Sequence, residues 1–146
     1  HRFKFAGDLA VGKWLSRELA SRVRALPPPA CIVAPPLTAA RLRQRGFNQA
    51  LEAAKVVGRV VGAPVDRTAL VKVRETPPQP TLDARERRRN LRGVFECRRV
   101  FHGEHVAIVD DVLTTGATCE SMARVLKEAG AGRVSAWAIA LAGGPR

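Results

Sequence analysis

Residues 106–118 read Val-Ala-Ile-Val-Asp-Asp-Val-Leu-Thr-Thr-Gly-Ala-Thr, and this stretch decides the fold. Its apolar start belongs to a strand predicted from His105 to Val109, and a helix predicted over residues 118–129 follows it. Two adjacent carboxylates and a short loop rich in hydroxyl groups stand between them. Ligands of open α/β sheets bind at the carboxyl ends of the strands. The stretch therefore predicts a strand, a loop and a helix that together build a binding site.

The loop between this strand and this helix has the chemistry of a phosphate cradle. Backbone N–H groups at a helix N-terminus bind anions, and Gly116 lets a ligand approach the backbone closely. Hydroxyl donors come from Thr114, Thr115 and Thr118. The carboxylates of Asp110 and Asp111 would repel each other unless sugar hydroxyls or a divalent cation stood beside them. These groups predict a phosphorylated sugar as the ligand, with Mg²⁺ as its companion.

A simpler interpretation of the same residues is a tight turn in which Asp110 and Asp111 cap the following helix. Two common phosphate-binding loops are excluded by the spacing. No Lys follows the Gly of this loop, as a Walker motif requires, and the chain contains no Gly-x-Gly-x-x-Gly dinucleotide loop. From the sequence, helix capping and ligand binding both remain open for the two carboxylates.

Helices and strands alternate along the remainder of the chain. Apolar spacing predicts helices over residues 7–26 and 48–62, the second capped by Asn48. Short apolar runs predict strands over residues 31–34, 69–73 and 134–140. This alternation is typical of an α/β domain with a mainly parallel sheet. We expect a single domain over 1–146, with a helical N-terminal segment at 1–30 and a core at 31–146, and we expect Cys31, Trp14 and Trp137 to be buried.

Residues 74–93 interrupt this pattern because they have almost no apolar side chains. A short helix is predicted from Asp83 to about Asn90, capped by Thr81 or Asp83. Long polar connections inside a compact domain are usually functional or mobile. An Arg-rich segment next to a phosphate cradle can act as an electrostatic lid.

Composition and charge limit the class of protein. The chain of 146 residues carries 25 Lys and Arg against 13 Asp and Glu, a net charge of +12. Residues 100–146 hold four basic and five acidic groups, so the whole excess of positive charge precedes residue 100. No apolar run reaches the ~20 residues that span a bilayer, and no secretion signal is visible, so we expect no membrane insertion. Three widely spaced cysteines predict no zinc site within this chain and a reducing, cytoplasmic location.

Three stretches carry a resemblance to a known family. They are Arg-Leu-Arg-Gln-Arg-Gly-Phe-Asn-Gln at 41–49, Thr-Pro-Pro-Gln at 76–79 with Arg-Arg-Arg-Asn-Leu-Arg-Gly at 87–93, and residues 109–118. With these stretches the chain resembles the ComF/GntX family of phosphoribosyltransferase-like proteins, which is associated with competence and DNA uptake. The resemblance implies a type I phosphoribosyltransferase fold, with a twisted, mainly parallel sheet of about five strands, flanking helices and a mobile loop.

The same resemblance implies roles in binding phosphoribosyl pyrophosphate (PRPP). Asp110 and Asp111 would hold the ribose hydroxyls and Mg²⁺. The 5′-phosphate would be wrapped by Thr114, Thr115, Gly116, Ala117 and Thr118. The pyrophosphate would be approached by the loop after the first strand, which consists of Pro35, Pro36, Leu37 and Thr38. Mobile-loop arginines would neutralise the leaving pyrophosphate, namely Arg74, Arg85, Arg87, Arg88 and Arg89.

Three further features bear on the resemblance. Arg41, Arg43 and Arg45 form a basic patch that contacts either pyrophosphate or nucleic acid, or else is a solvated edge. Family members typically carry an N-terminal four-Cys zinc-binding segment, which the printed sequence lacks, so we expect a start inside a longer protein or a shortened homologue. Residues 1–30 are the candidate hood over an acceptor, but nothing in them identifies a base.

These observations lead to three hypotheses of function. In the first, the chain is an enzyme that transfers the phosphoribosyl group of PRPP to an unidentified acceptor, with release of pyrophosphate and with Mg²⁺. In the second, it is a non-catalytic DNA-uptake protein that binds single-stranded DNA or a competence helicase partner through its basic surface. In the third, it is a structural relative that has lost activity. A homodimer is a further expectation.

Overall fold

The centre of the molecule is a parallel sheet of three strands. The computed structural model describes residues 2–76, 84–113 and 115–141. The strands are β1 (Cys31–Val33), β4 (His105–Leu113) and β5 (Arg133–Leu141), in the spatial order β1-β4-β5. Strand β4 pairs with both neighbours and packs against helices on both faces, and this burial explains its continuous apolar run.

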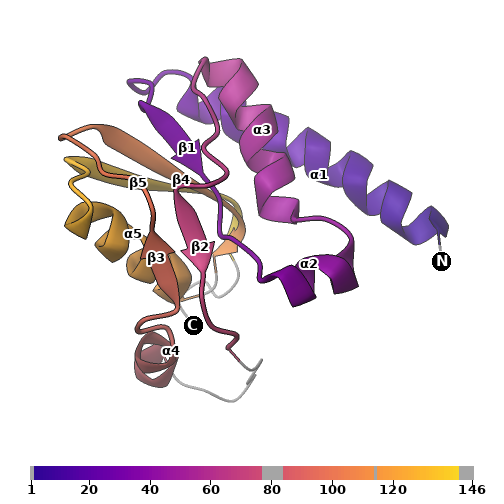
Figure 1. The fold of residues 1–146 in the computed structure, drawn as a ribbon. Coiled ribbons are helices and arrows are strands. Elements are labelled where there is room, and N and C mark those ends of the chain that lie inside the picture. The colour runs from indigo at the N-terminus through magenta and orange to yellow at the C-terminus, as the bar shows by residue number, and fades with distance from the viewer. Residues whose placement is uncertain (1, 77–83, 114, 142–146) are drawn as a thin grey trace.

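Helices cover the two faces of this sheet (Figure 1). On one face lie α1 (Arg2–Val23) and α3 (Gln49–Val61), and on the other lies α5 (Ala117–Glu128). Successive side chains of a strand point to opposite faces. Accordingly, Ala107 and Val109 pack with α1 and α3, whereas Val106 and Ile108 pack with α5.

A second, smaller sheet lies beside α5. Strands β2 (Leu70–Lys72) and β3 (Phe95–Cys97) pair in antiparallel orientation, and α4 (Ala84–Asn90) lies in the connection between them. The α/β fold with a mainly parallel sheet is confirmed. The five described strands, however, form two sheets rather than one, because β2 pairs with β3 and only Val65 continues the edge of β1, through a single bridge to Ile32.

The N-terminal helix differs from the sequence prediction at its end and on its buried face. It ends at Val23, and among residues 11–23, whose side chains the structure describes, Ser16, Ala20 and Val23 are buried. Trp14 is 64% exposed, so the prediction that it packs in the core is wrong. Small side chains face the core here, which leaves the bulky indole on the outer side of the helix. Cys31 and Trp137 are buried, as predicted. No helix in the described part of the chain is long and apolar enough to cross a membrane.

Sequence periodicity missed the short helix α2 (Ala39–Arg45), in which no residue is buried. Its caps define it instead. The Thr38 hydroxyl accepts a hydrogen bond from the Arg41 N–H, and Gly46 ends the helix in the left-handed region at φ 83°. The sequence signal for this helix was the pair of caps, since Thr38 precedes Gly46 by eight residues.

Candidate functional site

Two carboxylates stand near the C-terminal end of β4, where the sheet topology places ligands. Asp110 is only 8% exposed, and one of its oxygens accepts a hydrogen bond from the Asp111 N–H at 2.8 Å. Asp111 in turn accepts one from the Val112 N–H at 2.9 Å. No ion pair joins either carboxylate to a Lys or Arg of the described residues.

The capping interpretation of these two residues is wrong. Their carboxylates accept from the backbone immediately after them, whereas Gly116 holds the N-cap position of α5 and supplies no side-chain hydrogen bond. The carboxylates are therefore directed by β4 rather than by the helix.

The electrostatics of the pair agree with ligand binding. Burial and, after it, the neighbouring Asp111 carboxyl together raise the pKa of Asp110 from 3.8 to about 7. The Cys119 thiol stands 4.0 Å from the second Asp110 oxygen, a weak donor that stabilises the charge little. A cation or a set of hydroxyl donors would lower this pKa again.

The donor set fits Mg²⁺ accompanied by a substrate rather than a cage made by the protein alone. Carboxylate oxygens are hard ligands, and Mg²⁺ is usually held by one or two of them together with waters and substrate oxygens. Asp110 and Asp111 can supply two such ligands. Within the described part of the chain, no group of three or more His, Cys, Asp and Glu is arranged to hold a metal ion.

The loop before α5 offers backbone donors to an anion. Gly116 has a φ of 74°, and this left-handed conformation turns the chain into the helix. The first amides of a helix have no partner within the helix and attract anions. Among the described residues, the Ala117 N–H makes one long side-chain contact, of 3.4 Å, with the Thr115 hydroxyl. Thr118 lies in the first turn of α5, and Thr114 lies outside the described residues.

The predicted pyrophosphate loop, Pro35 to Thr38, follows β1 and is held from two sides. Asn48 caps α3 as predicted, and its amide also donates to the Pro35 carbonyl at 2.9 Å. The Thr38 hydroxyl donates to the Glu75 carboxylate. Because β1 and β4 are parallel neighbours, this loop and the C-terminal part of β4, which contains the two Asp residues, lie at the same edge of the sheet.

Glu75 occupies the donors that this loop presents. The hydrogen bond from Thr38 lowers the pKa of Glu75, and Lys72, whose Nζ lies 3.7 Å from its carboxylate, lowers it further. The side chain is exposed. A carboxylate held by a hydroxyl and a Lys shows that this corner of the site suits an anion.

Hydrogen bonds join the two ends of the Arg-rich connection, residues 74–93. The Arg74 guanidinium donates to the carbonyls of Asn90 and Arg92 at 3.0 and 2.9 Å, so this predicted pyrophosphate ligand joins the two ends of the segment. After α4, the Leu91 carbonyl accepts from the Ser121 hydroxyl of α5 at 3.0 Å. Arg85 and Arg89 are exposed on α4. Residues 77–83 and the side chains of Arg87 and Arg88 lie outside the described part of the chain.

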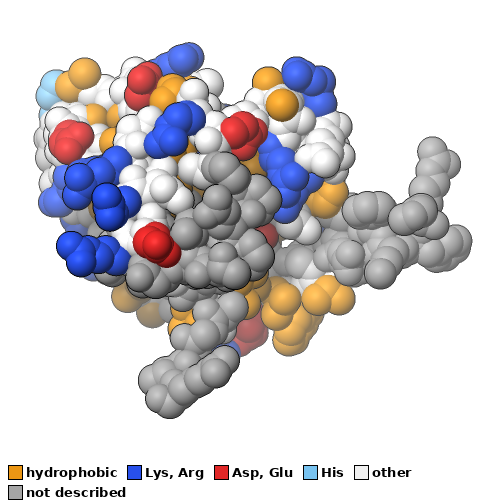
Figure 2. Space-filling view, turned by 90° about the horizontal axis from the view of Figure 1, so that it is seen from below, with side chains coloured by type: hydrophobic (Ala, Val, Ile, Leu, Met, Phe, Trp, Pro, Cys, Tyr) orange, Lys and Arg blue, Asp and Glu red, His pale blue; other side chains and the backbone are white. Residues whose placement is uncertain are grey.

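The predicted basic patch lies on α2. Residues two apart on a helix point in nearly opposite directions, so Arg43 faces away from Arg41 and Arg45. The Arg41 guanidinium donates to Gln44 at 2.8 Å. Figure 2 shows Lys and Arg side chains in separate groups on one face of the molecule, with acidic and uncharged side chains between them.

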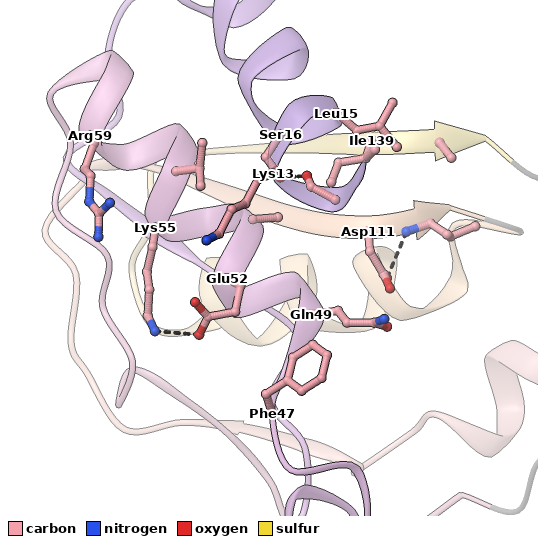
Figure 3. A pocket seen from close by; sticks show the side chains of 15 residues that line it. Lys13, Leu15, Ser16, Phe47, Gln49, Glu52, Lys55, Arg59, Asp111 and Ile139 are labelled. Carbon is pink, nitrogen blue, oxygen red and sulfur yellow. Dashed lines mark hydrogen bonds and ion pairs between the residues drawn. The ribbon is translucent and has the colours of Figure 1, made fainter. Parts of the chain in front are cut away.

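A cavity of about 360 Å³ lies beside Asp111, and sequence reasoning did not find it (Figure 3). Helices α1 and α3 and the ends of β4 and β5 all contribute to its walls. Residues so distant in the chain form no motif. The available signal was the position of Asp111 near the C-terminal end of an inner strand, where ligands of α/β sheets bind.

Curated relatives match nearly all of the chain. DNA utilization protein YhgH of Salmonella typhi is 36% identical over 145 residues, which is 95% of this chain and 64% of that protein. Competence protein F of Haemophilus influenzae is 32% identical over 150 residues, which is 97% of this chain and 66% of that protein. The chain thus spans somewhat less than two thirds of the length of the YhgH relative. No family model matches it.

Solved structures identify the fold. A purine phosphoribosyltransferase from Pyrococcus horikoshii superposes with a TM-score of 0.57 at 20% identity, covering 89% of this chain and 72% of that one. A glutamine PRPP amidotransferase from B. subtilis superposes with a TM-score of 0.59 at 25% identity, covering 88% of this chain and 26% of that one. The type I phosphoribosyltransferase fold expected from the sequence is confirmed.

Proposed function

Because this chain belongs to the ComF family and has a type I phosphoribosyltransferase fold, we propose that it binds PRPP with Mg²⁺ at the end of β4 and transfers the phosphoribosyl group to an acceptor. Pyrophosphate is the second product, and the activity serves competence and DNA utilization. The observation that carries the proposal is Asp110, a buried carboxylate with no described cation beside it.

Each part of PRPP meets a group of suitable chemistry. The ribose hydroxyls donate to Asp110 and Asp111, which removes the electrostatic cost of two adjacent carboxylates. The 5′-phosphate accepts from the amides of residues 115–118 at the start of α5. The pyrophosphate lies toward Thr38, from which it displaces Glu75. Arg side chains of the 74–93 segment add positive charge to that side.

The chain contributes positioning and charge stabilisation. Bound Mg²⁺ supplies positive charge that makes pyrophosphate a better leaving group. A nitrogen lone pair of the acceptor forms a bond to the anomeric carbon while the bond to the pyrophosphate oxygen breaks, and the pyrophosphate keeps that electron pair. A proton lost by the acceptor nitrogen passes to water. Holding the ribose and its phosphate fixed makes this displacement effectively intramolecular.

Calorimetry with PRPP and Mg²⁺ tests the proposal. The wild-type protein should bind, and the double variant Asp110→Asn/Asp111→Asn should lose about 100-fold or more in affinity, because it removes two charge-assisted contacts. Glu96→Gln, an exposed carboxylate on β3, is the matched control and should bind normally. Absence of binding by the wild type, or undiminished binding by the double variant, contradicts the proposal.

A second function is favoured by the distribution of charge. The residues before position 100 carry all the excess positive charge, and α2 adds three exposed or half-buried Arg side chains. Single-stranded DNA or a helicase partner would bind such a surface. DNA affinity should then fall steeply as salt rises, because each phosphate contact releases counterions. A flat salt dependence contradicts this function, and competition by PRPP shows whether the two ligands share arginines.

A further inference from the structure

The cavity beside Asp111 is a groove between two helices. One face of α3 forms its long wall, because the α3 residues that line it recur at helical spacing. These are Gln49, Glu52, Ala53, Lys55, Val56 and Arg59. The opposite wall belongs to α1, around Gly12 and Ser16, and the ends of β4 and β5 close the groove. Its volume of about 360 Å³ is ordinary for a small-molecule site.

The charges in this groove are not evenly distributed. In Figure 3, Lys13, Lys55 and Arg59 lie on the side away from Asp111. Lys55 is paired with Glu52 at 2.6 Å. No ion pair to Lys13 or Arg59 is formed by the described residues. One end of the groove thus presents two cations that lack a described counter-charge, while the other end adjoins the carboxylate proposed to hold the ribose.

The middle of the groove is largely apolar. Its apolar lining includes Leu15, Phe47, Val56, Val112 and Ile139. The half-buried Phe47 ring can lie against a flat aromatic ligand, an arrangement that stabilises ring pairs. A ligand that satisfies the whole groove is therefore flat and apolar in its middle and negatively charged at the end far from Asp111.

We propose, on the basis of the proposed function, that this groove takes the acceptor and that the acceptor is a nitrogen heterocycle bearing a carboxylate. The carboxylate faces Lys13 and Arg59, the ring lies against Phe47, and a ring nitrogen faces the Asp111 end, where the anomeric carbon of PRPP would stand. A neutral nucleobase would leave the two cations without a partner, so it should bind more weakly.

Matched ligand pairs test the charge requirement directly. Orotate and uracil share one ring, as do nicotinate and nicotinamide, and only the first of each pair carries the carboxylate. Binding to the wild-type protein is measured by saturation-transfer NMR and by calorimetry, with and without PRPP and Mg²⁺. For at least one pair, the carboxylated member should bind about tenfold or more tightly than its neutral partner, as expected of a charge-assisted contact.

Variants assign this preference to the groove. Lys13→Gln/Arg59→Gln should remove the preference for the carboxylate, whereas Arg124→Gln, an exposed Arg on α5, should keep it. Gly12→Phe should block the groove, because a Cβ at Gly12 meets nothing within 4 Å and the ring has open space to enter. Gly12→Ala is its control and should bind as the wild type does, with a slightly more stable helix.

The outcomes separate this inference from the proposed function. Equal or tighter binding of the neutral rings, binding of neither member of either pair, or normal heterocycle binding by Gly12→Phe overturns the assignment of the acceptor. If PRPP still binds in these experiments, the proposed function stands without it. Failure of the wild type to bind PRPP overturns the proposed function instead.

Discussion

Asp66 and Asp110 are carboxylates of the same type in two regions of one fold, and their surroundings differ in almost every respect. Asp66 accepts hydrogen bonds from the N–H groups of Thr68 and Ala69 at 3.0 and 2.8 Å, and from the Arg99 guanidinium at 2.9 Å. Asp110 accepts from one backbone amide and stands 4.0 Å from a thiol.

The pKa values of the two groups move in opposite directions. Burial alone would raise the pKa of Asp66, but the hydrogen bonds from Thr68, Arg99 and Ala69 hold it below its ordinary value. Burial raises the pKa of Asp110 to about 7 because no comparable donors oppose it. A carboxylate with its partners inside the protein stabilises the fold, whereas one without them is available to a ligand. A buried carboxylate without such partners lowers the stability of the free protein.

The largest expected effect concerns Asp110→Asn. This change should reduce PRPP affinity about 100-fold while making the free protein more stable above pH 7, because a neutral amide costs less to bury than a charge. The gain should be on the order of a few kcal/mol, since each pKa unit corresponds to about 1.4 kcal/mol. Thermal unfolding and PRPP calorimetry on one preparation measure both. A variant that binds PRPP normally, or that is less stable than the wild type above pH 7, would contradict the proposed difference between Asp110 and Asp66.

The opposite change in stability is expected of Asp66→Asn. It should lower the free energy of unfolding by about 2 kcal/mol, because it weakens a charge-assisted bond to Arg99 and replaces one carboxylate oxygen by an amide donor. PRPP affinity should stay at the wild-type value wherever the variant is folded. Denaturant unfolding gives the first quantity and calorimetry the second. A loss of PRPP affinity equal to that of Asp110→Asn would show that the two regions are not distinct.

The pH dependence of stability should have opposite sign for the two groups. Between pH 4 and 7 the folded protein holds a proton on Asp110 that the unfolded chain lacks, so the stability of the wild type relative to Asp110→Asn falls as pH rises through this range. The contribution of Asp66 is present above its ordinary pKa and is lost as pH falls through the folded value. Unfolding curves from pH 3 to 9 for both variants measure these profiles, and parallel profiles would contradict the assignment.

The smallest expected effect concerns Glu75, whose carboxylate accepts a hydrogen bond from the Thr38 hydroxyl. Glu75→Gln should raise PRPP affinity only by roughly two- to fivefold, because an exposed charge is screened by solvent. Titration at low and high salt measures this, and the gain should shrink at high salt. Weaker binding by Glu75→Gln would mean that the carboxylate helps to hold the ligand instead of competing with it.

The sequence pattern predicted the strand, the loop and the helix around Asp110 because these features are local. An apolar run, two acids and a hydroxyl-rich loop lie within thirteen residues, so the strand, the turn and the helix are encoded together. The same holds for α3, whose cap Asn48 and terminal Gly62 are both visible in the sequence.

Features that depend on packing were not predictable in this way. The exposure of Trp14 follows from the small residues through which α1 meets the core. The division of the strands into two sheets depends on which strand β2 pairs with, which its three residues do not specify. Asp66 and Arg99 are 33 positions apart, and only the fold brings them together. The groove beside Asp111 draws on four elements, and no local sequence pattern could reveal it for the same reason.

The number of protons released when PRPP binds tests the proposed role of Asp110 most directly. Calorimetry with Mg²⁺-saturated PRPP in buffers of different ionisation enthalpy measures it. Ribose hydroxyls and a cation beside Asp110 should lower its pKa, so binding at pH 7 should release roughly half a proton. At pH 9 the release should vanish, because Asp110 is already ionised. Binding without proton release at pH 7, or no binding at all, would contradict the proposal that Asp110 binds the ribose of PRPP.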